Sequence, residues 1–471
     1  MKSTKTILLI DWPGTNWPPG VYTKHSCLEP YGLECVGALA KDHGYKIKIF
    51  QFRHNSLSRV MDSVKRHSPF AVGVSVKTYN LASCLLLAKA IKSWKRSIYV
   101  IFGGEHPSLC PDIVTEKQVD YAVRGEGELA FLDLLYALES NGDITRVNNI
   151  AFRKNGNLFI NPQKRILNLD ELPFALRNSG ILKDCKQFGF AYPSISQQKS
   201  VAQINYSRGC PYNCSFCASP KVWNRLVIYR NPDKIIEEIF ILKDKYETNL
   251  VFFADLTFNL NKEKAKELCR KIITSRVKIN WFCMCRPQKI DNGLLQLMKE
   301  AGCSKIGWGI ESLNEISLSN IKPGQQNRIE EIGEVLNLSH SLGIINRAYL
   351  MIGYPWEGIK DIEKTFSSVK RIPIDELKVS FFTPFPGTPA YQRYRKSLIT
   401  DDMNRYTTDE PIIRATNIHS QKLIKIRKEV VKEFYRSKEY QKRLKEKIKK
   451  YRYLEQPYKD FIGFLKTRAI I

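Results

Sequence analysis

The sequence predicts an α/β protein made of two successive sheets and a helical end. Two observations support this prediction. Short apolar runs alternate with amphipathic helical segments up to about residue 390, and the alternation breaks between about 146 and 198. The last 80 residues or so are predicted to be helices rich in lysine and arginine. We therefore expect a first domain (1–145), a linker (146–198), a second domain (199–390) and a helical region (391–471).

The first domain is predicted to be a doubly wound sheet of five parallel strands, covered by helices on both faces. The expected strands are 6–10, 46–50, 71–76, 99–102 and 121–123, with helices near 29–43, 55–67, 80–94, 108–117 and 129–140. Ligands of such sheets bind at the loops after the strands. Unusual residues occupy these loops, namely Trp12-Pro13-Gly14, Lys77-Thr78-Tyr79, Gly103-Gly104-Glu105-His106 and Gly125-Glu126-Gly127-Glu128. The glycine pairs either let the backbone approach a large ligand or form tight turns.

A hairpin is expected in the linker, where Asn155-Gly156 separates two short apolar runs. The second domain is predicted to contain six strand–helix units, with strands at 202–206, 250–254, 280–284, 305–310, 346–351 and 377–382. Six units are fewer than the eight of a closed barrel, so we expect a partial (β/α)6 barrel.

Composition and charge narrow the classes of function. With 43% hydrophobic and 26% charged residues the chain is globular, and no stretch approaches the roughly 18 apolar residues of a membrane span. The apolar run at 7–10 is too short for a signal peptide, so a cytoplasmic location is expected. The net charge of +27 favours contact with nucleic acid, an anionic membrane surface or an acidic substrate.

Three of the 12 cysteines are closely spaced. Cys210, Cys214 and Cys217 lie within eight residues, after a predicted strand and Gly209. Three thiolates leave a tetrahedral zinc site one ligand short, whereas iron–sulfur clusters are held by closely spaced cysteines. On three cysteines, a four-iron cluster keeps one iron open for a substrate or cofactor. The spacing therefore predicts an iron–sulfur cluster.

The Cys-x3-Cys-x2-Cys motif, with Phe216 before its last cysteine, resembles that of the radical S-adenosylmethionine (SAM) enzymes. Asn205–Pro211 is similar to the segment that leads into the family's cluster loop, and Met351–Glu357 to the segment that contacts the SAM adenine. Many relatives carry two consecutive acids after the second strand, but Leu256 stands in the second place here. The resemblance implies a [4Fe–4S] cluster on the three cysteines and SAM contacts from Phe216, Asp255, Arg286, Glu311, Ser312, Gly353 and Glu357.

The first domain resembles the flavodoxin-like cobalamin-binding domain that precedes many radical SAM domains. The similar segments are Gly103–Pro107, Asp120-Tyr121 and Gly125–Glu128, and the whole resemblance covers about residues 5–390. It implies that cobalamin is held by Trp12, Pro13, Lys77, Thr78, Tyr79, Gly103, Gly104, Glu105, Gly125 and Glu126. The Asp-x-His-x-x-Gly loop whose histidine binds cobalt in methionine synthase-like proteins is missing. We expect His106 to form a hydrogen bond, and cobalt to have no histidine ligand (His-off).

Two smaller features favour structural interpretations. Trp12 and Trp17 either cover a flat macrocycle or cap the core between the domains. Cys283 and Cys285 share one face of a strand and are expected to form a buried wall rather than a second metal site. The sequence shows no Ser-His-Asp arrangement, no His-Glu-x-x-His motif and no Walker-type loop.

The resemblance implies reductive cleavage of SAM to methionine and a 5′-deoxyadenosyl radical, which abstracts hydrogen from an unactivated carbon. Methylation of a carbon or phosphinate centre through methylcobalamin is the favoured function. Cyclisation, carbon–carbon coupling or rearrangement of a lipid or tetrapyrrole is the first alternative. An RNA-modifying or nucleic-acid-binding protein is the alternative of another class. It is disfavoured because the chain has no second cysteine triplet and no appended RNA-binding module. The expected partners are a small-molecule or lipid-like substrate and an electron donor such as flavodoxin or ferredoxin.

The C-terminal region holds 17 basic and 6 acidic residues from Gln421 to Ile471. Apolar residues recur at helical spacing between Leu423 and Ile448. In one interpretation these helices pack on the barrel and expose their basic face to solvent. In the other, the region contacts an anionic membrane through Lys442, Arg443, Lys445, Lys447, Lys449 and Lys450, while Phe461, Phe464 and Leu465 dip into the headgroups.

Overall fold

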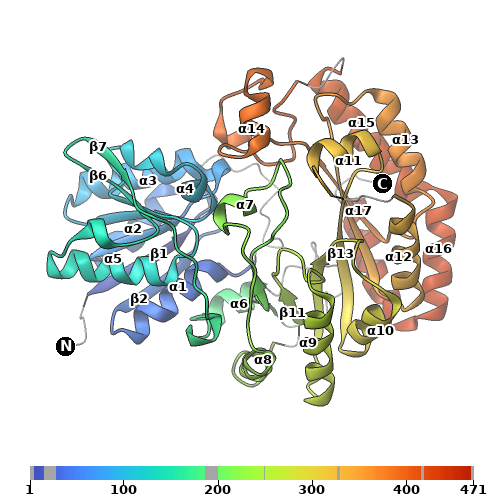
Figure 1. Ribbon diagram of the computed structural model, residues 1–471, viewed down its shortest axis with the longest axis horizontal. Helices are drawn as coiled ribbons and strands as arrows, with labels where there is room; N and C mark the ends of the chain where they lie inside the picture. Colours follow the sequence, from blue (N-terminus) through green and yellow to red (C-terminus); the bar gives the residue numbers. More distant parts are fainter. Residues whose placement is uncertain are drawn as a thin grey trace.

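The computed structural model describes residues 5–14, 28–185, 200–248, 250–325, 329–414 and 418–467. Trp17 and the side chain of Phe464 lie outside the described residues. Two sheets lie side by side, the first domain coloured from blue to teal and the barrel from green to orange, and α16, in red, lies on the side of the barrel away from the first domain (Figure 1).

The first domain contains a seven-stranded sheet in the order β2-β1-β3-β4-β5-β6-β7. Its strands are β1 Thr6–Asp11, β2 Lys46–Gln51, β3 Ala71–Ser75, β4 Tyr99–Gly103, β5 Tyr121–Val123, β6 Ile150–Lys154 and β7 Asn157–Ile160. Its helices are α1 Tyr31–Asp42, α2 Leu57–His67, α3 Leu81–Trp94, α4 Glu105–Leu109 and α5 Glu128–Ser140. Leu8 and Ile10 of β1 pack on the side of α2 and α3, whereas Ile7 and Leu9 pack on the side of α1 and α5. The doubly wound sheet is therefore confirmed.

Two details of the first domain differ from the prediction. The hairpin of β6 and β7, expected in the linker, pairs with β5 and extends the sheet of the first domain. The single helix expected near 108–117 is divided into α4 and a 3₁₀ turn, Pro111–Thr115. The division falls at Cys110, because the residue before a proline is disfavoured in helical conformation.

The second domain contains six parallel strands in the order β15-β14-β13-β12-β11-β8. They are β8 Val201–Ile204, β11 Leu250–Phe253, β12 Asn280–Cys285, β13 Cys303–Glu311, β14 Ile345–Ile352 and β15 Glu376–Phe381. The helices between them are α8 Pro232–Tyr246, α9 Lys262–Thr274, α10 Asn292–Glu300, α11 Glu315–Ile321, α12 Ile329–Ser341 and α13 Ile359–Val369. Because β8 and β15 are the two edges and do not pair, the barrel is open, as predicted.

The helical C-terminal region contains α14 Pro389–Tyr394, α15 Ser420–Arg436, α16 Lys438–Lys450 and α17 Glu455–Thr467. The apolar faces of α15, α16 and α17 are buried in the same core as the barrel strands. Lys447 is also buried, and its ammonium group donates to the Ile344 carbonyl at 2.7 Å and to Asp375 at 2.6 Å. The packed arrangement is therefore confirmed. The prediction that Phe461 and Leu465 dip into a membrane is wrong, because both side chains lie in this core.

Candidate active site

The cysteine loop begins at the carboxyl end of β8. It is closed by a short hairpin of β9 (Ser207–Arg208) and β10 (Ile228–Tyr229). Gly209 has φ +107°, and a Cβ atom there would lie 1.9 Å from the Leu226 carbonyl oxygen, so that only glycine fits. Cys210, Cys214 and Cys217 are half-buried in this loop. The fold thus presents three thiols at one strand end.

Each sulfur has a polar neighbour, one from the loop itself and two from other parts of the barrel. The Ser219 hydroxyl lies 3.2 Å from the Cys217 sulfur, Gln325 Nε2 donates to the Cys214 sulfur at 3.6 Å, and Thr257 hydrogen-bonds Cys210. Burial raises the pKa of Cys210 and of Cys217, and the neighbouring thiols add to both shifts. The three thiols therefore lie close enough to influence one another.

Three free thiols at the end of one strand are the kind of ligand set that holds an iron–sulfur cluster. The ligands of an iron–sulfur cluster bind different iron atoms, so their sulfurs lie farther apart than those around one ion. Donors to cluster sulfurs are also a normal part of such sites. The residues present therefore fit a [4Fe–4S] cluster.

Two cations lie beside the cysteine loop, at the carboxyl ends of β12 and β13. The Arg286 guanidinium carbon lies 3.9 Å from the centre of the Tyr212 ring. Lys322 is 4% exposed and donates to the Gly309 carbonyl at 3.1 Å. Burial raises the pKa of Glu311, while the charges of Lys322 and Arg286 lower it. Two positive charges and one carboxylate are thus close together here, and the contacts of Arg286 and Glu311 with SAM stay predictions.

Asp255 anchors the start of the cysteine loop. Its carboxylate accepts from the Tyr206 amide at 3.1 Å and from the amide and hydroxyl of Ser207, both at 2.5 Å. Burial raises the pKa of Asp255 to about 6, although the hydrogen bonds from Ser207 and Tyr206 oppose the shift. Both oxygens are thus engaged with the loop, and the contact of Asp255 with SAM stays a prediction.

The segment after β14 turns sharply at Gly353, which has φ +83°. The Glu357 carboxylate accepts from the Gly353 amide at 2.6 Å and from the Tyr354 amide at 3.4 Å. Burial raises the pKa of Glu357 to about 7. Phe216 of the cysteine loop packs in the same apolar cluster as Tyr354, while Ser312 is buried beyond β13. The turn therefore borders the loop, and the SAM contacts of these residues stay predictions.

A cavity of about 540 Å³ lies between the first domain and the barrel, at the carboxyl ends of β1, β3, β4 and β5. Gly103, Gly104 and Gly125 form part of its rim, where the backbone carries no side chain that would hold off a flat ring. Leu9 and Phe131, which pack between the sheet and α5, also line it. The two domains therefore share a cavity of ligand size.

The predicted cobalamin residues divide into two groups. Six line the cavity, namely Lys77, Gly103, Gly104, Glu105, Gly125 and Glu126. Trp12, Pro13, Thr78 and Tyr79 do not. Trp12 is buried in the core of the first domain, and its indole N–H donates to the His54 carbonyl at 2.7 Å. The turn Thr78–Asn80 packs instead against Met403–Arg405, so the C-terminal region also contacts the first domain.

Several residues that line the cavity come from outside the predicted loops. Glu29, Pro30 and Tyr31 precede or begin α1, and Arg208 and Trp223 belong to the barrel side of the cavity. No motif marks these residues, because their place depends on how the two domains meet.

Glu126 is the centre of an ion-pair network that joins the domains. Its carboxylate lies 2.7 Å from Arg165 and 3.2 Å from Arg208, and Arg208 also lies 2.7 Å from Glu128. All four side chains are nearly buried. Since Arg208 immediately precedes the cysteine loop, this network fixes the cavity relative to the three thiols.

A second buried ion pair supports the same interface from the other side. Arg177 lies 3.4 Å from Glu29 and 2.9 Å from Glu238 of α8. Glu29 also accepts from the Gln203 amide of β8 at 2.5 Å. The segment before α1 is thereby bound to the first barrel strand.

His106 is placed as the sequence predicts. It is 4% exposed, and its Nδ1 lies 3.2 Å from the Thr78 hydroxyl. Burial lowers its pKa to about 4. Among the described residues, no histidine lines the cavity.

Comparison with known proteins identifies both halves of the site. The B12 binding domain model matches residues 21–135, and the radical SAM superfamily model matches residues 204–369. This chain is a radical SAM enzyme with a B12-binding domain.

Relatives of this radical SAM enzyme match most of its length. An uncharacterized methyltransferase of Pyrococcus horikoshii is 27% identical and covers 86% of this chain and 87% of its own. The anaerobic magnesium-protoporphyrin IX monomethyl ester cyclase of Rubrivivax gelatinosus is 26% identical, over 85% of this chain and 70% of its own. The radical SAM methyltransferase TsrM of Kitasatospora setae, solved with cobalamin and a [4Fe–4S] cluster, has the same fold. Its TM-score is 0.69 at 18% identity, covering 84% of this chain and 75% of TsrM.

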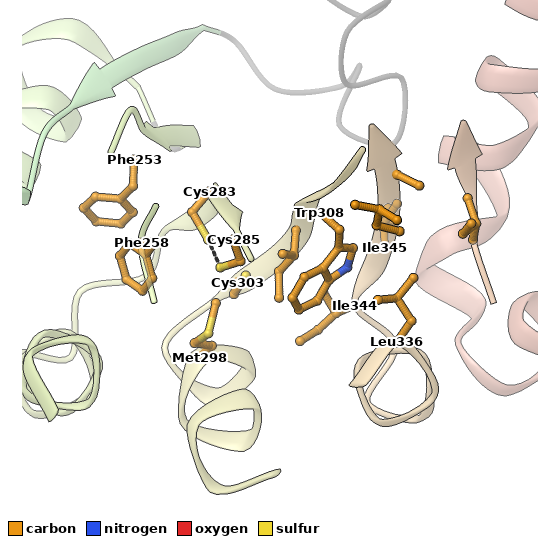
Figure 2. Close-up of a cluster of buried hydrophobic side chains, with 14 of the residues drawn as sticks. Phe253, Phe258, Cys283, Cys285, Met298, Cys303, Trp308, Leu336, Ile344 and Ile345 are labelled. Carbon is orange, nitrogen blue, oxygen red and sulfur yellow. Dashed lines mark hydrogen bonds between the residues drawn. The ribbon is translucent and has the colours of Figure 1, made fainter. Parts of the chain in front are cut away.

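The other cysteines of the radical SAM domain are buried away from the cysteine loop. Cys283 and Cys285 lie 3.6 Å apart at their sulfurs, near Cys303 and Met298, and Figure 2 shows them among apolar side chains. They pack with α9 and α10 in the core of the barrel. The expected buried wall is consistent with this packing.

No helix among the described residues is long and apolar enough to cross a membrane.

Proposed function

We propose that this radical SAM enzyme is a cobalamin-dependent methyltransferase that acts on an unactivated carbon or phosphinate centre of a small molecule. One observation supports this most strongly. The glycine-rimmed cavity and the cysteine loop meet at a single interface, joined by Arg208, which lines the cavity and precedes Cys210 by two residues. A methyl carrier in the cavity would therefore lie next to the thiols.

The residues of the chain have distinct tasks in this proposal. Cys210, Cys214 and Cys217 would hold the cluster, and Arg286 and Lys322 would neutralise the SAM carboxylate. When bound, the cluster supplies one electron for SAM cleavage and cobalamin supplies a transferable methyl group. The buried ion pairs of Glu126 hold the cavity and the cysteine loop in a fixed relative position, and they close the barrel side of the cavity. The chain itself thus binds the cofactors, orients them relative to each other and excludes water from the site.

The relatives support methylation and also one alternative. The Pyrococcus relative and TsrM are both named methyltransferases. The Rubrivivax relative is named a cyclase. A radical cyclase that acts on a tetrapyrrole or a lipid is therefore the second candidate, since the same cofactors serve both reactions.

Three finer proposals concern the partners. We propose that cobalt is His-off, because His106 is buried against Thr78 and does not line the cavity. We propose that an electron donor such as flavodoxin or ferredoxin supplies the reducing electron. For the basic C-terminal region we propose only an electrostatic contact with anionic surfaces, through exposed lysines such as Lys442 and Lys445.

Product analysis tests the function. Reconstituted enzyme is incubated without oxygen with SAM, a reductant and fractionated small molecules, and the products are analysed by mass spectrometry. Methylation adds one CH2 to a substrate and yields S-adenosylhomocysteine and 5′-deoxyadenosine together. A product that lacks two hydrogens, without S-adenosylhomocysteine, would contradict methylation and favour the cyclase.

A further inference from the structure

An exposed tip, Lys221–Leu226, covers the outer side of the cysteine loop. Within it Lys221, Asn224, Arg225 and Leu226 are exposed, Leu226 by 42%. Arg225 Nε donates to the carbonyl of Pro211 at 3.1 Å, next to Cys210. At the base of the tip, Ser219 contacts the Cys217 sulfur. Arg225 therefore links the tip to the residue after Cys210, and the tip begins two residues after Ser219, the neighbour of Cys217.

The backbone of the tip is held in an unfavourable conformation. Asn224 and Arg225 are consecutive non-glycine residues with φ +47° and +57°. Left-handed residues of this kind cost roughly 1–2 kcal/mol each and persist only where their surroundings hold them. Arg165 of the first domain provides such support, because its guanidinium donates to the carbonyls of Trp223 and Leu226 and lies 5.0 Å over the Trp223 ring. The tip is thus a fixed surface.

The tip is cationic. No Asp or Glu occurs in the sequence from Cys185 to Pro232, which contains six lysines and arginines. Two of these, Arg208 and Arg230, are paired with glutamates. Lys221 and Arg225 form no ion pair with any described residue. A small positive surface with the apolar Leu226 at its end therefore lies beside the cysteine loop.

We propose that the Lys221–Leu226 tip is the docking surface for an acidic one-electron carrier protein. This inference rests on the proposed function, in which each SAM cleavage consumes one electron. The carrier is oxidised by one electron and the cluster is reduced by one, and no bond or proton changes at the surface. Electron transfer weakens steeply with distance, so the carrier should dock where the surface contacts the cysteine loop. Electron-transfer complexes bury little area, under about 1,200 Å², and so need only a small patch.

Charge reversal tests the docking surface. The double variant Lys221→Glu/Arg225→Glu is compared with Lys245→Glu/Lys278→Glu, which reverses the same charge at two other exposed positions. Lys245 and Lys278 precede β11 and β12 and so lie at the amino ends of these parallel strands, whereas the cysteine loop begins at the carboxyl end of β8. Both reconstituted enzymes are mixed in a stopped-flow instrument with a reduced acidic flavodoxin, and loss of the cluster's visible absorbance gives the second-order rate constant.

We expect the tip variant to reduce this rate constant tenfold or more at low salt, on the scale of electrostatic steering. The rate for the wild type should fall with added salt, while that for the tip variant should hardly change. Photoreduced deazaflavin, a small reductant, should reduce all three proteins equally. Equal loss in the control variant, or no loss in the tip variant, would overturn the docking surface. Failure of deazaflavin to reduce the wild type would instead overturn the cluster and the proposed function.

Discussion

The cysteine loop and the cavity differ in how the chain builds them. All three thiols come from eight consecutive residues, and one hairpin and one glycine fix the loop. The cavity is assembled from four strand ends, the segment before α1, and the barrel residues Arg208 and Trp223. A local site of the first kind depends on a few covalent neighbours. A composite site of the second kind depends on the contact between two domains, so the two sites should fail in different ways.

The largest expected effect is at the cysteine loop. Replacing Cys210, Cys214 and Cys217 together with Ala should abolish the visible absorbance of the cluster and all formation of 5′-deoxyadenosine, because no other described thiols lie on this loop. The cavity should be untouched, so the variant should still take up cobalamin. Iron content, absorbance and product analysis measure the loss.

Cys283→Ala is the matched control for this triple variant. Its thiol is buried in the barrel core, so its loss should cost on the order of 1 kcal/mol of stability and leave the cluster content unchanged. A triple variant that still cleaves SAM reductively, or a control that loses the cluster, would contradict the assignment of the cysteines.

The second effect concerns the composite site. Arg208→Ala leaves the buried carboxylates of Glu126 and Glu128 without this partner, and breaking a buried pair costs about 3–5 kcal/mol. Cobalamin uptake should fall more than cluster content, because the network joins the domains at the cavity. Urea denaturation and the cobalamin content of the purified protein measure both effects.

Lys234→Ala is the control for Arg208, since the Lys234–Glu237 pair is about half exposed. Such a surface pair contributes about 0–1 kcal/mol, so little change is expected. If Arg208→Ala kept full stability and full cobalamin uptake, the ion-pair network would not be what holds the two domains together at the cavity.

The same contrast explains what the sequence could predict. Both sheets followed from apolar runs with the periodicity of strands, and the cysteine loop followed from its spacing. The hairpin of β6 and β7 was predicted as a hairpin but assigned to the linker, because its pairing with β5 depends on a tertiary contact. Glu126 was predicted to contact cobalamin because it lies in a glycine-rich loop. Its carboxylate pairs with Arg165 and Arg208, which lie 39 and 82 residues away in the sequence. No local pattern contains that information.

At Glu357 we expect a smaller effect, which changes the pH dependence of the free energy of unfolding but leaves the cluster content unchanged. Burial raises the pKa of Glu357 to about 7, from about 4.5 in an unfolded chain, so the folded protein binds this proton more tightly than the unfolded chain. The contribution to stability is therefore complete below pH 4.5 and is lost as the pH rises through about 7, a change on the order of 3 kcal/mol. Glu357→Gln can keep the hydrogen bond from Gly353 and should remove this part of the pH dependence.

The measurement at Glu357 is the unfolding free energy of the wild type and the variant from pH 4.5 to 8. Cluster content should stay the same in both proteins, because Glu357 lies outside the cysteine loop. An unchanged pH slope in Glu357→Gln would show that this carboxyl does not titrate in that range.

The smallest effect should be at His106, which lies beside the composite site without lining it. The ring is buried against Thr78, and burial lowers its pKa to about 4, so it is a neutral core residue. His106→Ala should cost roughly 1–3 kcal/mol for the lost packing and hydrogen bond, and leave the visible and electron paramagnetic resonance spectra of bound cobalamin unchanged. His54→Ala, at the other histidine near Trp12, serves as the control for general disturbance of the first domain. A nitrogen splitting on cobalt that disappears only in His106→Ala would reverse the conclusion, because the ring would then have to leave Thr78 and enter the cavity when cobalamin binds.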